Sequence, residues 1–207
     1  MKIAGTEVTI SQLAFPAIAM MAVVAASNVL VQYPVQHFGL AEVLTWGAFT
    51  YPLAFLVNDL TNRRFGPAVA RRVVYFGFAL AVVLSIWLAT PRIALASGTA
   101  FLVGQLLDIG VFNRLRRMSW WQAPLAGSFL GSAIDTVLFF SLAFAGDAEM
   151  SFAVTYHLTG ITVPLWVGLA FFDFVVKMAC ALLSLVPYGA LMGWLKPWGG
   201  VQGSPAR

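Results

Sequence analysis

Six long apolar runs divide this chain of 207 residues. A helix needs about 20 mostly apolar residues to cross the roughly 30 Å of hydrocarbon in a bilayer. Hydrophobic residues make up 60% of the chain and charged residues 10%, against about 25% charged residues in ordinary soluble domains. We therefore predict an all-α polytopic membrane protein, with residues 1–195 as one transmembrane bundle and residues 196–207 as a flexible cytoplasmic tail. Its six transmembrane helices are expected at about 13–33, 42–60, 73–90, 94–112, 124–145 and 164–190.

The basic residues predict the orientation of this bundle. If the N-terminus is cytoplasmic, ten of the 12 Lys and Arg residues lie on the cytoplasmic side, while Arg92 lies outside. Excess Lys and Arg in short loops marks the cytoplasmic face, so both termini are expected there. Topology also explains the net charge of +4, and we expect the lipid bilayer rather than nucleic acid as a partner. The ten residues are Lys2, Arg63, Arg64, Arg71, Arg72, Arg114, Arg116, Arg117, Lys196 and Arg207.

Signatures of soluble enzymes are missing from the sequence. It has no HExxH pair, no nucleophile elbow and no glycine loop for phosphates. His37 and His157 come from opposite halves of the chain, and Cys180 is the single cysteine. We therefore expect no enzyme activity, no cofactor, no metal site and no internal disulfide.

Charged residues inside the apolar runs are the candidates for function. A charge near the middle of a bilayer costs at least about 2.5–3.5 kcal/mol on insertion scales, so it should face the bundle interior. Asp135 is near the middle of its run with no basic residue within one turn. Asp173 and Lys177 are four residues apart and share a helix face. The alternatives are a buried interhelical hydrogen bond for Asp135 and a self-neutralising pair for the other two.

Two further helices contribute polar pairs to the same interior. Gln105 and Asp108 are three residues apart and share a face with Phe101, while Asn28 and Gln32 are four apart on the first helix. Four helices with inward polar groups predict a ligand cavity. Small residues before Asp135 (Gly127, Ser128, Gly131 and Ser132) would let another helix or a ligand approach, although they could equally serve a homodimer.

The aromatic residues indicate what such a cavity would bind. Aromatic side chains close in sequence to amides and carboxylates suit a flat, neutral, hydrogen-bonding heterocycle better than a bare ion. At the cytoplasmic end, the spacing of Asp59 and Arg63 allows an ion pair, with a structural and a functional role both open. The aromatic residues are Tyr33, Trp46, Phe49, Tyr51 and Phe101.

Five stretches resemble the bacterial queuosine precursor transporters, the YhhQ type within the vitamin uptake transporter family. The resemblance covers about three quarters of the chain, in order and at compatible spacing. The stretches are "ASNVLVQYPV" (26–35), "TWGAFTYPLAFLVNDLTNRRFGPAVARR" (45–72), "RIALASGTAFLVGQLLDIGVFNRLRR" (92–117), "WWQAPLAGSFLGSAIDTVLFF" (120–140) and "FDFVVKMACALLSLVPYGAL" (172–191).

This resemblance implies an importer of 7-cyano-7-deazaguanine and 7-aminomethyl-7-deazaguanine in the bacterial inner membrane. Polar family positions coincide here with Asn28, Gln32, Trp46, Asp59, Arg63, Gln105, Asp108, Asn113, Arg114, Asp135, Asp173 and Lys177. Of these, Asp59, Arg63, Asn113 and Arg114 are expected to act in gating or as cytoplasmic salt bridges.

The purine-like substrate suggests roles for the remaining residues. One ionised carboxylate can accept hydrogen bonds from both N1–H and the 2-amino group. We expect Asp135 or Asp108 in this role, with Lys177 holding Asp173 or contacting the 7-substituent. The 6-oxo group would bind Gln105, Asn28 or Gln32, and the ring would stack on Trp46 or Phe101.

The sequence leaves two other mechanisms open. The chain contains no ATP-binding motif, so it would act as a secondary carrier or as the membrane-embedded binding subunit of an energy-coupling-factor importer. An intramembrane enzyme that uses two aspartates as acid and base is the third alternative. Proton-coupled and facilitated transport are equally compatible with these residues.

Overall fold

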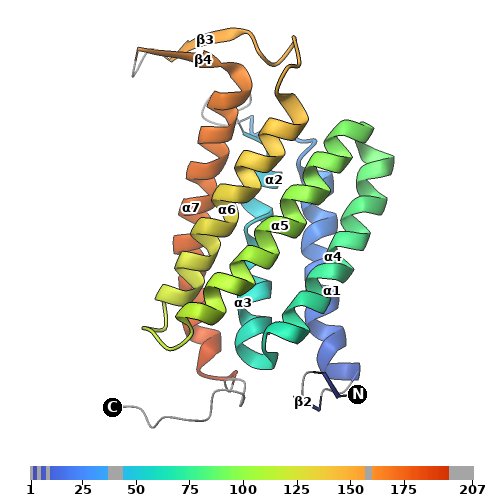
Figure 1. Cartoon of the computed structure of the whole chain (residues 1–207), viewed down its shortest axis with the longest axis vertical. Coiled ribbons are helices and arrows are strands. Elements are labelled where there is room, and N and C mark those ends of the chain that lie inside the picture. Colours follow the sequence, from blue (N-terminus) through green and yellow to red (C-terminus); the bar gives the residue numbers. More distant parts are fainter. Residues whose placement is uncertain (1, 4–5, 8–9, 37–43, 157–159, 196–207) are drawn as a thin grey trace.

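The computed structural model describes residues 2–3, 6–7, 10–36, 44–156 and 160–195, and most of these residues are helical (Figure 1). The helices are α1 (Ile10–Leu30), α2 (Gly47–Thr50), α3 (Leu53–Phe65), α4 (Pro67–Leu88), α5 (Pro91–Leu115), α6 (Gln122–Phe144) and α7 (Leu165–Met192). Two short antiparallel hairpins are formed by β1 (Lys2–Ile3) with β2 (Thr6–Glu7), and by β3 (Ala153–Tyr156) with β4 (Ile161–Pro164). The predicted all-α fold class is thus confirmed for the bundle, apart from these hairpins.

Five helices of the described residues are long and apolar enough to cross a membrane: α1, α4, α5, α6 and α7. They correspond to five of the six expected spans. The expected continuous helix at 42–60 is wrong, because this region contains two separate helices, α2 and α3. Pro52 has no amide hydrogen to donate, and its ring disfavours a continuous helix at the junction. The first two residues of that expected span and the expected tail at 196–207 lie outside the described residues.

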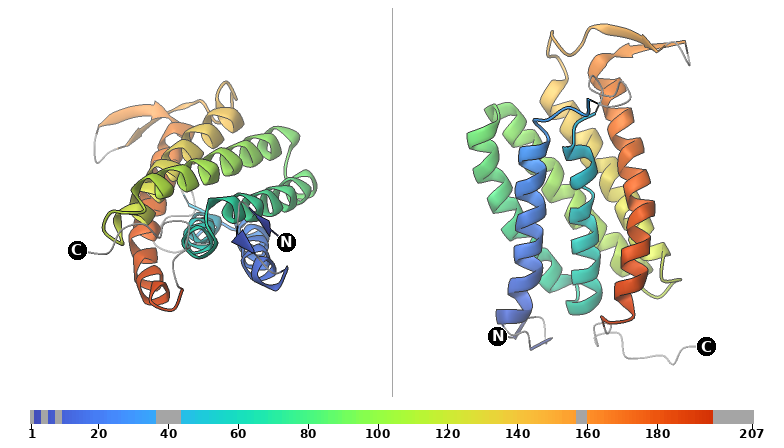
Figure 2. Two further views of the ribbon diagram at one scale, coloured as in Figure 1. Left: turned by 60° about the horizontal axis from the view of Figure 1, so that its bottom comes forward. Right: turned by 180° about the vertical axis from the view of Figure 1, so that it is seen from behind.

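The helices run along one axis and leave α3 near the centre. In the rear view of Figure 2, α3 lies between α1 and α7, and it packs against both helices. The turn from α3 to α4 lies at the end of the bundle where α1 begins and α7 ends (Figure 1). Gly66, at φ 82°, makes this turn in a backbone region that side-chain-bearing residues rarely adopt.

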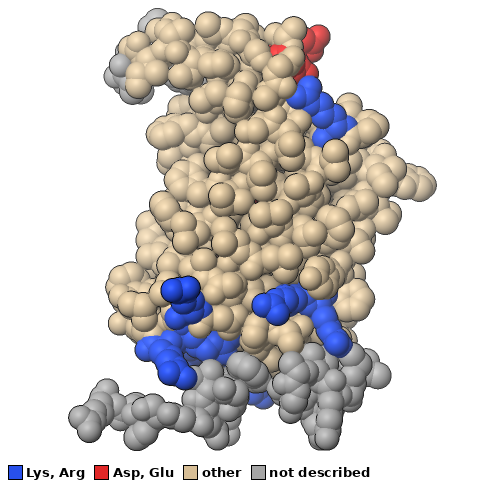
Figure 3. Space-filling model, viewed as in Figure 1, with Lys and Arg blue, Asp and Glu red and all other residues tan. Residues whose placement is uncertain are grey.

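The outer surface is apolar along the length of the bundle. Phe15, Trp87, Leu183 and Val186 each expose more than two thirds of their surface, which is the arrangement expected where lipid replaces water. Figure 3 shows Lys and Arg gathered at one end, where Arg63 and Arg64 lie in the last turn of α3. The ends of the bundle are therefore chemically different from its middle.

The hairpin β3–β4 lies at the opposite end, next to α7 and between α6 and α7 along the chain (Figure 1). No sequence pattern predicted this hairpin. At this end Arg92 donates hydrogen bonds to the carbonyl oxygens of Leu142 and Ala145, at 2.9 and 2.6 Å. It thereby satisfies carbonyl groups that have no partner within the last turn of α6.

The most extensive contact between two helices is that between α5 and α6, and glycine residues allow their backbones to approach closely. A Cβ atom added to Gly104 would lie 3.0 Å from the carbonyl oxygen of Gly131, and one added to Gly131 would lie 2.9 Å from that of Gly104. The expectation that small residues near Asp135 admit a second helix is thus confirmed, and that helix is α5.

Candidate functional site

A network of charged side chains centred on Lys177 connects α6 to α7. The Lys177 ammonium lies 2.7 Å from Asp135 Oδ2 on α6 and 2.6 Å from Asp173 Oδ2 on its own helix. It also donates a hydrogen bond of 3.1 Å to Thr136 Oγ1, and the Thr136 hydroxyl donates to Asp173 Oδ2 at 2.8 Å. The i,i+4 pairing follows from the helical spacing of Asp173 and Lys177, whereas the bond to Asp135 depends on the packing of α6 against α7.

Tyr51 completes this network from the break between α2 and α3. Its hydroxyl donates a hydrogen bond of 2.9 Å to Asp135 Oδ1, and its ring centroid lies 5.3 Å from Lys177 Nζ. The interruption of the helix at Pro52 therefore places an aromatic donor beside two charged groups. With two carboxylates and one ammonium ion, the network carries a net charge of −1 when all three groups are ionised.

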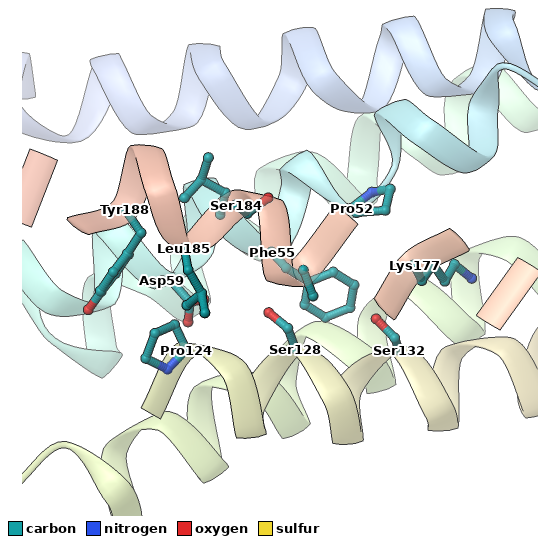
Figure 4. A pocket seen from close by; sticks show the side chains of 12 residues that line it. Pro52, Phe55, Asp59, Pro124, Ser128, Ser132, Lys177, Ser184, Leu185 and Tyr188 are labelled. Carbon is teal, nitrogen blue, oxygen red and sulfur yellow. The ribbon is translucent and has the colours of Figure 1, made fainter. Parts of the chain in front are cut away.

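A narrow cleft between α3, α6 and α7, with room for little more than one water molecule, borders this network. Lys177 and Ser132 lie toward one end and Asp59 and Tyr188 toward the other, as Figure 4 shows. Lys177 and Tyr188 are 11 positions apart on α7, which corresponds to about 16 Å along a helix. The cleft is lined by Pro52, Phe55, Leu56, Asp59, Pro124, Ser128, Ser132, Lys177, Ala181, Ser184, Leu185 and Tyr188.

Asp108 and Gln105 lie in a second polar cluster between α3 and α5. The Asn58 amide donates to Asp108 Oδ2 at 2.8 Å and to the backbone oxygen of Gln105 at 3.2 Å. Both polar atoms of the Gln105 side chain, together with Asp108 Oδ1, are buried without a hydrogen-bond partner. A Cβ atom added to Gly127 would collide with Asp108 Oδ1. This carboxylate therefore packs against the backbone of α6, and there is no room for a base beside that oxygen.

Asp59 and Arg63 do not form the ion pair that their spacing allowed. The ion pairs within the described part of the chain both involve Lys177. Arg63 instead interacts with Tyr188 of α7, while Asp59 lines the cleft. The side chains of Asp59 and Arg63 contact different neighbours, and a separation of four residues in the sequence cannot predict which neighbours these are.

A cluster of hydrogen bonds joins the ends of α3 and α5 at the basic end of the bundle. One Arg116 nitrogen donates to Asn62 Oδ1 at 2.7 Å and to Asn113 Oδ1 at 2.8 Å, and it also reaches the backbone oxygen of Asn62 at 2.8 Å. Burial, and to a smaller extent Arg63, lowers the pKa of the Arg116 guanidinium from its ordinary value. Arg114, which the sequence singled out, is exposed. Arg116 therefore holds the position that was expected for Arg114.

Four expected binding residues lie away from the cleft. Asn28 accepts a hydrogen bond from Ser85 of α4 and donates to the backbone of its own helix. Gln32 is exposed, and Trp46 packs on Phe49 with 44% of its surface exposed. Phe101 is buried and meets the Tyr51 ring edge to face at 6.1 Å. The residues of the described chain that line the cleft do not include these four side chains.

Comparison with known proteins identifies the family. Residues 45–90 and 83–192 match the family described as "Putative vitamin uptake transporter". A "Queuosine precursor transporter" of Escherichia coli K12 is 36% identical over 197 residues, which cover 84% of this chain and 83% of the relative. The chain belongs to this family.

Two further relatives of the family come from other bacteria. A "Probable queuosine precursor transporter" of Haemophilus influenzae is 34% identical over 202 residues, covering 82% of each chain. Another protein of that description, from Bacillus subtilis, is 26% identical over 190 residues, covering 78% of this chain and 76% of the relative. No solved structure matches this chain. The expected membership is confirmed, and a multi-pass membrane protein related to transporters is shown.

Sequence reasoning missed four residues that the structure places in these polar groups. Tyr51 was noted only as an aromatic residue, and Asn58, Thr136 and Arg116 received no role in the site. Thr136 directly follows Asp135, and Asn58 directly precedes Asp59. A polar residue directly next to a buried carboxylate was therefore the signal that could have identified Thr136 and Asn58 from the sequence.

Proposed function

We propose that this protein imports 7-cyano- and 7-aminomethyl-7-deazaguanine across the bacterial inner membrane, and that the base binds at the Lys177 end of the cleft. The names of the relatives support the substrate class. The observation that carries the proposal is the pairing of Lys177 with the buried Asp135 and the partly exposed Asp173 at the border of a cleft, inside a bundle with an apolar outer surface.

The chemistry of this group complements the hydrogen-bonding edge of the base. A 7-deazaguanine presents the 6-oxo acceptor next to two donors, N1–H and the 2-amino group. A lysine next to an aspartate presents a donor next to an acceptor. Lys177 would give up its longest bond, the one to Thr136 Oγ1, and donate to the 6-oxo group instead, and Asp173 would accept from the donor pair. Lys177 and Thr136 both bind Asp173 Oδ2, which leaves Oδ1 for the base.

Asp173 is preferred over Asp135 for this contact because of its exposure. The side chain of Asp173 is 17% exposed, whereas the side chain of Asp135 is 4% exposed. Asp135 is also bonded on both oxygens, to Tyr51 and Lys177. We propose that Asp135 fixes Lys177 in position and that Phe55, on the wall of the cleft, stacks on the ring.

Transport through this cleft requires the helices around it to move. We propose that α2 and α3 together make a sixth crossing and that both termini are cytoplasmic, as the basic end of the bundle indicates. The cleft is too narrow in this conformation for a base to pass. Two helix irregularities on its walls allow bending: the break at Pro52, and Pro187 inside α7.

Uptake of labelled 7-aminomethyl-7-deazaguanine into proteoliposomes tests this function. Purified protein should exchange labelled for unlabelled compound across the membrane, and Asp173→Asn and Asp135→Ala should abolish the exchange while the protein still inserts. Asp147→Asn is the matched control, because an asparagine at that loop position can still accept the backbone hydrogen bonds of Glu149 and Met150. Normal exchange by Asp173→Asn would reject the binding assignment.

Competing compounds test the orientation of the base. The analogue without the 2-amino group loses a hydrogen bond to a charged acceptor, worth about 1.5–3 kcal/mol, so it should compete at least about tenfold more weakly. If this analogue competes as well as the complete base, the proposal that the donor edge of the base binds Asp173 is contradicted. Exchange that depends on added ATPase subunits would favour a binding subunit, and chemically altered compound in the vesicles, seen by mass spectrometry, would favour an enzyme.

A further inference from the structure

Two buried carboxylates lie outside the Lys177 network. Asp59 on α3 is 2% exposed and Asp108 on α5 is 0% exposed. Each has one oxygen, Oδ1, that is buried without a hydrogen-bond partner. No ion pair joins either carboxylate to a lysine or arginine of the described chain. The two groups are near enough to interact electrostatically with each other.

The neighbouring helices do not supply the missing positive charge. Lys177 of α7 is already shared by Asp173 and by Asp135 of α6. Arg116, after α5, binds the oxygens of Asn62 and Asn113. Arg63 on α3 and Tyr188 on α7 also lie near Asp59, and neither forms an ion pair with Asp59 or Asp108.

Two ionised carboxylates in this setting would be strongly unfavourable. Removing one such ion from water costs several kcal/mol even after relaxation, and a like charge nearby adds to the cost. Buried carboxylates in such pairs bind a proton instead. Asn58 Oδ1 and both polar atoms of the Gln105 side chain are also buried without a partner, so the cluster has unused hydrogen-bonding groups.

The packing favours a proton over a metal ion. A metal ion needs several oxygen ligands at about 2.0–2.6 Å around open space. Asp108 Oδ1 packs so closely on Gly127 that even a Cβ atom there would collide with it. A proton needs no such space.

We infer that Asp59 and Asp108 form a proton-binding site that couples proton entry to the transport described above. This inference rests on the proposed function for its biological meaning. Asp59 lines the cleft, whereas Asp108 lies behind it, between α3 and α6. Opening of the cleft to the cytoplasm hydrates Asp59, whose carboxyl group then transfers its proton to water and becomes a carboxylate. Closure of the cleft returns the pair to the state that requires a proton, and the pair takes this proton from water of the external solution when the cleft opens to that side.

Infrared spectroscopy of the purified protein detects the bound proton directly. The wild-type protein should show the carbonyl band of a protonated buried carboxyl group at neutral pH, and the double variant Asp59→Asn with Asp108→Asn should lose it. Asp147→Asn, which alters an acid outside the pair, should keep the band. A wild-type spectrum without the band overturns the inference, whether or not the protein transports a base.

Proteoliposomes with a pH gradient test the coupling. With acid outside, wild-type protein should accumulate labelled 7-aminomethyl-7-deazaguanine above its external concentration and acidify the lumen, and a protonophore should abolish both. Asp108→Asn should reach only equal concentrations on the two sides, whereas Asp147→Asn should accumulate compound like the wild type.

The outcomes separate this inference from the proposed function. Exchange in the wild type without any effect of the pH gradient rejects the proton site and leaves the transport function intact. Accumulation that depends on a sodium gradient, tested by replacing sodium with choline, also rejects it. Absence of exchange rejects the proposed function itself, and the infrared band then still decides whether the pair holds a proton.

Discussion

Lys177 joins two helices by serving carboxylates on both of them. Its bond to Asp135 is buried and its bond to Asp173 is partly buried, and removal of one member of such a group leaves an uncompensated charge inside the bundle. That situation typically costs about 3–5 kcal/mol. We therefore expect Lys177→Met to lower the free energy of unfolding by about that amount, measured by thermal unfolding in detergent.

The matched variant for this experiment removes the charges together. Lys177→Met combined with Asp135→Asn and Asp173→Asn leaves no unpaired ion, so it should recover most of the lost stability. If the triple variant is as unstable as the single one, the loss comes from packing of the lysine stem rather than from charge.

The sequence predicted some members of the charged network around Lys177 but not how they are arranged in space. Asp173 and Lys177 could be paired from their spacing, because residues four apart always share a helix face. Asp135 could be assigned to the interior from the insertion cost of a charge. Its partners Tyr51 and Lys177 could not be identified, because they depend on how α3 and α7 are placed around α6. For the same reason Asn28 and Gln32 were expected in the cavity, while the structure turns them toward α4 and the surface.

The packing of α5 on α6 depends on positions without a side chain. At Gly127 an added methyl group would collide with Asp108 Oδ1, and overpacking of this kind typically costs about 1–3 kcal/mol. Gly127→Ala should therefore destabilise the protein. Gly110→Ala on α5 is the matched control, because nothing lies within 4 Å of the added atom, and alanine is favoured in helices by about 0.5–1 kcal/mol. Opposite shifts of the melting temperature are expected, and a shared direction would contradict the close approach at Gly127.

Arg116 fastens the end of α3 to the end of α5. Arg116→Ala removes its hydrogen bonds to Asn62 and Asn113, and we expect a loss of about 1–3 kcal/mol in the free energy of unfolding. Arg117→Ala removes a charge from the next, exposed position and should change stability by less than about 0.5 kcal/mol. Equal effects of the two variants on thermal unfolding would show that general charge, rather than the bonds between α3 and α5, stabilises this end.

Element boundaries show where sequence reasoning stopped. Five spans were recognised because their length and apolar composition are set by the bilayer. The segment expected at 42–60 contains Asn58 and Asp59, which are tolerated because α3 is surrounded by other helices rather than by lipid. Hydropathy describes contact with lipid, so it carries little information about a helix at the centre of a bundle. The hairpin β3–β4 was missed because it forms outside the apolar runs.

The bundle as a whole is polar at its centre and basic at one end. An uneven distribution of Lys and Arg determines membrane orientation. The end of the bundle where α1 begins and α3 turns into α4 is therefore expected in the cytoplasm, and the hairpin β3–β4 is expected outside. In a Cys180→Ala background, Ser151→Cys should react with an impermeant thiol reagent in intact cells. Met118→Cys, in the exposed turn after α5, should react only after the membrane is opened. Reversed labelling would place the basic end outside. Asp59 lies toward that end of the cleft, so it would then release its proton to the external solution, which is the wrong side for import.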